Sequence, residues 1–97
     1  MPKGYIIAHV NVHDPEPYQD YVKGNTPILK GRHGAEYIVR GGRSESVEGK
    51  AYDRHVVIAF ESYEAALAAY NDPEYQEIAE IRRKHSDGNL FVVEGTT

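Results

Sequence analysis

The order of its apolar segments constrains the fold of this chain more than any other feature. A strand-like segment, a helix-like segment and a second strand-like segment come before residue 41, and the same order recurs after residue 53. Two such βαβ units predict an α+β fold, the ferredoxin-like βαββαβ sandwich, in which helices cover one face of a four-stranded antiparallel sheet. Since 97 residues suit one core, we predict a single domain over residues 1–97.

The first unit begins with a strand at Gly4–Val12, where apolar and mixed positions alternate. Asp14-Pro15-Glu16 then predicts a helix start, with the aspartate as N-cap and the proline at the first helical position. Gly24 and Pro27 are expected to bend or interrupt this helix near Thr26, and the proline also removes a backbone donor. A second strand is predicted over residues 35–40.

The second unit begins with a strand at residues 54–60, which read RHVVIAF. Ser62 predicts the cap of a short helix, and Asp72-Pro73-Glu74 repeats the earlier start signal for another helix. Asp87-Gly88-Asn89 is expected to end that helix, and LFVVEG, residues 90–95, is predicted to be the last strand.

One face of the predicted sheet is left without helices. The helices are expected to cover the face formed by Ile6, Ala8, Val10, Val56, Ile58 and Phe60. The open face then carries Tyr5, Ile7, His9, Asn11, His55, Val57 and Ala59. It is too apolar to stay fully exposed and too polar for an ordinary core. We therefore predict a homodimer through the open sheet face, with its polar residues paired there or lining a cavity.

Composition excludes several kinds of partner. Fifteen acidic and eleven basic residues give a net charge of −4, which argues against a nucleic-acid or anionic-membrane surface. The absence of cysteine excludes thiolate metal sites and cysteine nucleophiles. No secretory signal and no apolar run long enough to span a membrane are evident, so a cytoplasmic location is the default expectation. No cofactor fingerprint is found, and no cofactor is predicted.

His9 and His55 are candidate proton-transfer groups. Each lies inside a strand on the open face, and the first and third strands of a ferredoxin-like sheet are neighbours, so one cavity can hold both. The alternative is that both are hydrogen-bonded at a dimer interface. A metal site is not predicted, because His9 and His13 on a strand lie about 13 Å apart, too far for one zinc ion.

Arg40 ends the run YIVRGG and is followed at once by two glycines. Its guanidinium is expected either to form a structural ion pair with Glu36 or Glu94, or to hold an anionic substrate in a bidentate clamp. Gly41-Gly42 allows a turn with positive φ and a close approach of the chain to whatever Arg40 binds. The motif lacks the features of a phosphate loop.

Eight tyrosines supply phenols that combine apolar bulk with one polar tip. Most are expected to fill the core or an interface. One or two are expected to point into a pocket between the sheet and the helices, and Tyr70 is the favoured one among those on helices. We predict that a ligand contacts Tyr5, Asn11, Tyr37 and Tyr70.

Four segments that together span almost the whole chain carry a family resemblance: GYIIAHVNVHDPEPYQDYV, YIVRGG, VVIAFESYEAALAAYNDPEYQ and GNLFVVEG. They resemble the small bacterial family of domain of unknown function thirteen-thirty. That family is similar to the dimeric α/β-barrel superfamily of ferredoxin-like protomers whose sheets face each other. The superfamily includes cofactor-independent monooxygenases and muconolactone isomerases. The resemblance implies the fold and the dimer, and it assigns no catalytic role to any residue.

Two functional hypotheses follow. The first is a cofactor-independent, monooxygenase- or isomerase-like enzyme for a small aromatic or lactone-like molecule. In it, His9 or His55 transfers a proton, Arg40 stabilises an anion or enolate, and tyrosines form apolar walls. The second is a binding or stress-related accessory dimer without chemistry, whose open face is only an interface. Of the two, we favour small-molecule binding and leave catalysis open.

Overall fold

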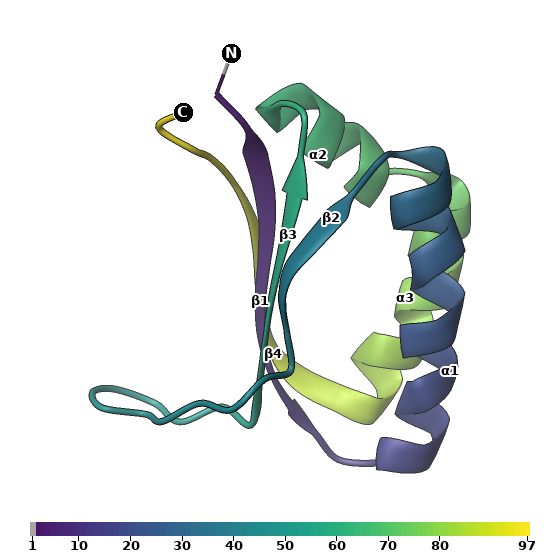
Figure 1. Ribbon diagram of the computed structural model, residues 1–97. Coiled ribbons are helices and arrows are strands. Elements are labelled where there is room, and N and C mark those ends of the chain that lie inside the picture. The colour runs from purple at the N-terminus through teal and green to yellow at the C-terminus, as the bar shows by residue number, and fades with distance from the viewer. Residues whose placement is uncertain (1) are drawn as a thin grey trace.

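The computed structural model describes residues 2–97, which form one antiparallel sheet covered on one side by helices (Figure 1). The strands, in sheet order, are β2 (Glu36–Arg40), β3 (Arg54–Phe60), β1 (Gly4–Val12) and β4 (Ser86–Glu94). The helical segments are α1 (Pro15–Thr26), the π-helix η1 (Pro27–Arg32), α2 (Tyr63–Tyr70) and α3 (Pro73–His85). This is the predicted ferredoxin-like fold. None of the helices in residues 2–97 is long and apolar enough to cross a membrane.

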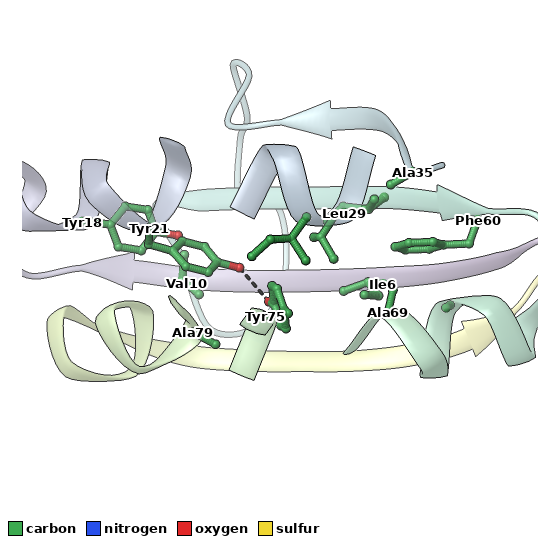
Figure 2. Close-up of a cluster of buried hydrophobic side chains, with 13 residues drawn as sticks. Ile6, Val10, Tyr18, Tyr21, Leu29, Ala35, Phe60, Ala69, Tyr75 and Ala79 are labelled. Carbon is green, nitrogen blue, oxygen red and sulfur yellow. Dashed lines mark hydrogen bonds between the residues drawn. The ribbon is translucent and has the colours of Figure 1, made fainter. Parts of the chain in front are cut away.

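The core lies between the helices and one face of the sheet (Figure 2). Along β1 every second residue is buried, as the alternating pattern predicts. Val56 is only partly buried, whereas the rest of the predicted helix face is fully buried. The buried side chains of this core are Ile6, Val10, Tyr18, Tyr21, Ile28, Leu29, Ala35, Ile58, Phe60, Ala66, Ala69, Tyr75 and Ala79.

A bulge in β2 decides where Tyr37 and Arg40 point. Tyr37 pairs with Ile58 and Arg40 with Val56, and the register shifts between Tyr37 and Val39. In a regular strand, residues three apart lie on opposite faces, but the extra residue of a bulge restores them to the same face. Tyr37 and Arg40 therefore both lie on the helix face, while Ile38 and Val39 remain 52% and 39% exposed.

The predicted helix starts are largely confirmed. Ser62 accepts a hydrogen bond from the amide of Ala65, and Asp72 accepts one from the amide of Glu74. Asp14 is the exception, because its side chain makes no cap hydrogen bond and instead lies 3.0 Å from Nδ1 of His85. The interruption predicted near Thr26 is also found, since α1 ends there and Pro27 begins the π-helix.

The last strand begins earlier than predicted. Asp87-Gly88-Asn89 does not form a terminating loop, because β4 already starts at Ser86 and pairs with β1 from Val12 onward. A Cβ atom on Gly88 would lie 2.0 Å from the backbone oxygen of His9. Gly88 therefore allows two strands to approach each other closely, and the helix-ending loop predicted from Asp87-Gly88-Asn89 is not formed.

The connection between β2 and β3, residues 41–53, forms a long arm. It projects away from the sheet on the side opposite to the helices (Figure 1). Val47 in the arm is 79% exposed. The arm thus extends the open face of the sheet rather than its helix face.

Candidate functional site

A pocket lies on the helix face, between the sheet and helices α1 and α3. Its empty volume is about 420 Å³ including the mouth, but the centre of a water-sized molecule has only about 20 Å³ in which to move. That space suits about one water molecule, so a larger ligand has to displace side chains at the rim. The lining residues are aliphatic side chains, tyrosines, one asparagine and three arginines: Ile6, Ala8, Val10, Tyr18, Tyr21, Val22, Asn25, Tyr37, Arg40, Arg54, Val56, Ile58, Tyr75, Arg82 and Leu90.

Tyr21 and Tyr75 form the deepest polar wall of the pocket. Their hydroxyl oxygens lie 2.7 Å apart, and the rings come from α1 and α3 (Figure 2). Burial raises the pKa of Tyr21 well above its ordinary value, and the neighbouring Tyr75 raises it further. Burial likewise raises the pKa of Tyr18. Tyr18 and Tyr21 therefore stay neutral and act as hydrogen-bond donors or acceptors, not as bases.

Tyr37 and Asn25 connect β2 to α1 at the same pocket. The Tyr37 hydroxyl donates to Oδ1 of Asn25, whose Nδ2 donates to the backbone oxygen of Tyr21 at 2.9 Å. Asn25 is buried, so these bonds satisfy its amide group. The sequence-predicted contact residue Tyr37 is therefore in the pocket, with its pKa raised by burial.

Arg40 lies at the rim of the pocket and clasps helix α1. Its Nη2 donates to the backbone oxygen of Val22 at 3.0 Å and to Oγ1 of Thr26 at 2.7 Å, and its guanidinium lies 4.0 Å from the centre of the Tyr37 ring. The predicted ion pair with Glu36 or Glu94 is wrong, because no side chain of residues 2–97 forms one with Arg40. The Val22 oxygen also accepts from Oγ1 of Thr26 at 3.1 Å, so Arg40 adds a second donor to this last turn of α1.

Two further arginines border the pocket, and sequence reasoning missed both as site residues. Arg54 starts β3 opposite Val10, and Arg82 comes from α3. Their guanidiniums lie 5.9 Å from the ring centre of Tyr18 and 5.7 Å from that of Tyr21, respectively. In the described chain, the Nε atoms of both are buried without a hydrogen-bond partner. The available signal for Arg82 was its helical spacing, which places it on the same side of α3 as the buried Tyr75 and Ala79.

The first glycine after Arg40 makes room for Arg54. Gly41 has φ +69°, and a Cβ atom there would lie 2.2 Å from Nη1 of Arg54. Glycine is thus required both by the backbone conformation and by the guanidinium packed against it. The close approach to Gly41 predicted from YIVRGG is found, but the side chain packed against this glycine is Arg54 and not the ligand of Arg40.

His9 and His55 lie on the opposite, open face of the sheet. They are direct partners across β1 and β3, and their Nδ1 atoms are 2.7 Å apart. Both border a groove beneath the arm, together with Glu45, Ser46, Val47, Glu48, Lys50 and Tyr52. The structure brings the two histidines together, as the strand order predicts. It does not bring them to Arg40, because the sheet separates the groove from the pocket, so the predicted joint site is wrong.

The remaining predicted contact residues also lie outside the pocket. Asn11 is on the open face, where it accepts from the Asp53 amide at 2.7 Å, and Tyr5 is paired with Ala59 and Val93 on that face. The Tyr70 hydroxyl lies 3.5 Å from Nη2 of Arg83, and the hydrogen bond from Arg83 lowers the pKa of Tyr70. Residues 2–97 contain no group of three or more histidines and carboxylates that could hold a metal ion.

Solved structures share the fold at low sequence identity. A protein of unknown function from Rhodopseudomonas palustris, RPA0582, superposes with a TM-score of 0.77 at 17% identity, over 99% of this chain and 84% of that one. A dimeric ferredoxin-like protein of unknown function from Thermobifida fusca gives 0.60 at 13%, over 96% and 89%. SnoaB, a cofactor-independent oxygenase from Streptomyces nogalater, gives 0.63 at 13%, over 100% and 96%.

The sequence comparison is more specific than these likenesses, which show the fold alone. No curated protein matches the sequence. A family model does match, and it covers residues 3–96, which include every strand, every helix and both the pocket and the groove. The chain therefore belongs to the family named Domain of unknown function (DUF1330).

Proposed function

We propose that the protein is a homodimer that binds a small apolar or aromatic molecule in the pocket of each protomer. The observation that carries this proposal is the pocket itself, which opens into an otherwise close-packed core and has walls of tyrosine and aliphatic side chains. Protein interiors are normally filled to high density, and ligand sites are concave, mostly apolar and furnished with a few polar groups. Because the enclosed space suits about one water molecule, a ligand enters this pocket by displacing side chains at its rim.

The dimer is proposed to form through the open face of the sheet. That face exposes large apolar side chains from both edge strands, namely Ile38, Val39, Phe91 and Val93. Contiguous apolar patches of this kind are uncommon on monomers, and a second copy offers an equally apolar, self-complementary surface. Two of the similar solved proteins are dimeric with a ferredoxin-like fold. Because the pocket is on the other face, dimerisation leaves its mouth open.

Binding is better supported than catalysis. An oxygenase or isomerase acting on an aromatic or lactone-like substrate needs a group that accepts a proton. The pocket is lined by phenols, guanidiniums and one amide, and neither a histidine nor a carboxylate is among its lining residues. The likeness to SnoaB is a likeness of fold, and the histidine pair lies on the other face of the sheet.

The pocket proposal is tested by binding measurements on a panel of small aromatic acids, amides, alcohols and lactones. We expect at least one class to shift backbone amide NMR signals around Tyr21, Asn25 and Tyr75. Shifts confined to the groove around His9 and His55, or no shifts with any compound, would contradict the proposal.

A matched pair of variants sharpens this test. Ala8 lies on the floor of the pocket, so Ala8→Leu fills part of it, whereas Ala68 is exposed on α2. We expect Ala8→Leu to weaken binding by about tenfold or more, because a ligand then competes with a side chain for the same volume. Ala68→Leu should leave the affinity unchanged. The NMR spectrum of each variant shows whether it is folded.

A further inference from the structure

We infer that the ligand of this pocket is an organic anion whose carboxylate binds between Arg54 and Arg82. The inference rests on the proposed pocket and goes beyond it by naming the chemical class of the ligand. It starts from the unused hydrogen-bond donors of two side chains that neither the fold nor the dimer explains.

The first observation is that Nε of Arg54 and Nε of Arg82 are buried without a partner. Buried donors in native proteins are almost always hydrogen-bonded, since an unpaired one loses its water and gains nothing. Two such donors border the same pocket in this chain. A ligand that accepts from both supplies the partners that the chain itself does not provide.

The second observation concerns charge. Arg32 is paired with Asp72 and Glu74, and Arg83 with Glu80. Arg54 and Arg82 have no carboxylate partner among residues 2–97, although the chain carries fifteen acidic residues and a net charge of −4. The pocket is therefore a positively charged site in an acidic protein, and an anion is the ligand that such a field attracts.

The third observation is that both guanidiniums border one pair of neighbouring, tilted rings. Arg54 lies over Tyr18 and Arg82 lies near Tyr21, and the two ring centres are 5.6 Å apart. Two cations at one end of a pocket repel each other unless an anion lies between them. A planar carboxylate can accept from the Nε and Nη donors of a guanidinium in the bidentate arrangement that arginine favours.

The rest of the pocket determines which apolar group the ligand carries beside its carboxylate. Beyond the arginines, its walls are Ile6, Ile58 and Leu90 together with the Tyr21 and Tyr75 rings. These surfaces suit an aromatic or branched apolar group and offer no second cluster of cations for a dianion. Because the space is narrow, the ligand has to displace flexible side chains at the rim. A small aromatic monocarboxylate fits these requirements.

The test compares benzoate and phenylacetate with their neutral amides on the wild-type protein. NMR follows the Nε–Hε signals of the arginine side chains, assigned with Arg54→Lys and Arg82→Lys. We expect the acids to shift the signals of Arg54 and Arg82 and to bind about tenfold or more tightly than the amides, because hydrogen bonds to a charged group are the stronger kind.

Two neighbouring positions of α3, Arg82 and Arg83, supply a matched control. Arg82→Met and Arg54→Met should abolish the preference for the acid, whereas Arg83→Met removes a cation that is already paired with Glu80 and should preserve it. Equal binding of acids and amides in the pocket would overturn this inference and leave the proposed function standing. Failure of every acid, amide, alcohol and lactone to bind in the pocket would overturn both.

Discussion

The two faces of the sheet differ in which of their side chains lack a partner within the chain. On the open face the polar side chains find partners within the chain: His9 with His55, Asn11 with the Asp53 amide, and Asn89 with the Tyr52 hydroxyl. Large apolar side chains remain exposed there. On the helix face the apolar side chains are buried, and the groups without partners are two arginine Nε atoms. We therefore propose a protein surface as the partner of the open face and a small anion as the partner of the helix face.

Adjacent residues of β1 give the largest test of this difference. Ile6 points to the helix face and is 1% exposed, whereas Ile7 is partly exposed on the open face. Ile6→Ala should lower the free energy of unfolding by about 3 to 4 kcal/mol, because it leaves a cavity in a packed core. Ile7→Ala should cost less, and its cost should depend on protein concentration if the open face is a dimer interface. Urea titrations at two protein concentrations measure both; equal, concentration-independent losses would contradict the assignment of faces.

The proposed dimer interface should give the next largest effect. Phe91 is 46% exposed in the centre of β4 on the open face, opposite Ile7. Phe91→Lys should weaken dimerisation by about 2 kcal/mol or more, roughly 30-fold in dissociation constant, because it removes an aromatic anchor and buries a charge. Sedimentation over a range of concentrations measures this change. Gln19→Lys adds the same charge to an exposed position of α1 and should leave the dimer intact; a wild-type protein that stays monomeric would refute the interface itself.

A carboxylate in the helix layer should make the stability of the fold sensitive to acid. Asp72 lies 2.7 Å from Nε2 of His33 and accepts from Nη1 of Arg32 at 2.9 Å and from the Glu74 amide at 2.9 Å. The His33 hydrogen bond above all, with Arg32 and the amide, holds the pKa of Asp72 well below its ordinary value of 3.8. The ionised group therefore stabilises the fold at pH values above that ordinary value, and this contribution is lost as the pH falls toward the lowered pKa.

Asp72→Asn tests this sign, because asparagine can still cap α3 but carries no charge. The variant should be less stable than the wild type at pH 6, and the difference should shrink as the pH falls below about 4. Asp20, which is exposed on α1 and forms no ion pair in residues 2–97, is the control. Urea titrations between pH 7 and 2.5 provide the measurement. A difference that grows on acidification would show that Asp72 does not stabilise the fold as an anion.

The sequence predicts the fold well because local patterns determine it. Alternation along β1 and β3, the serine cap of α2 and the proline that ends α1 each act over a few residues. The start of β4 could not be predicted in this way. Asp-Gly-Asn is chemically a turn signal, and the reason for Gly88, a close approach to the His9 backbone, depends on a strand far away in the sequence.

The site was predicted only in part, for a related reason. Tyr37 and Arg40 were singled out from the sequence and both line the pocket, but the bulge that turns both to the helix face leaves no clear mark in YIVRGG. Arg54 and Arg82 were missed because a strand start and a cationic last helical turn explain each of them locally. That both are buried without a partner depends on the packing of α3 and β3 around one pocket.

The smallest effect on ligand affinity is expected from a substitution on the open face of the sheet. His55 contacts His9 on the open face, and the sheet lies between this pair and the pocket. His55→Gln keeps a polar partner for His9 and should change the affinity for an aromatic carboxylate by less than about twofold, within the scatter of a surface substitution. Titration of benzoate into both proteins at one pH measures this. If the variant lost the ligand as Arg82→Met is expected to do, the two faces would be coupled, and the histidine pair would become part of the binding site. An unchanged affinity would confine the histidines to the interface and the anion to the helix face.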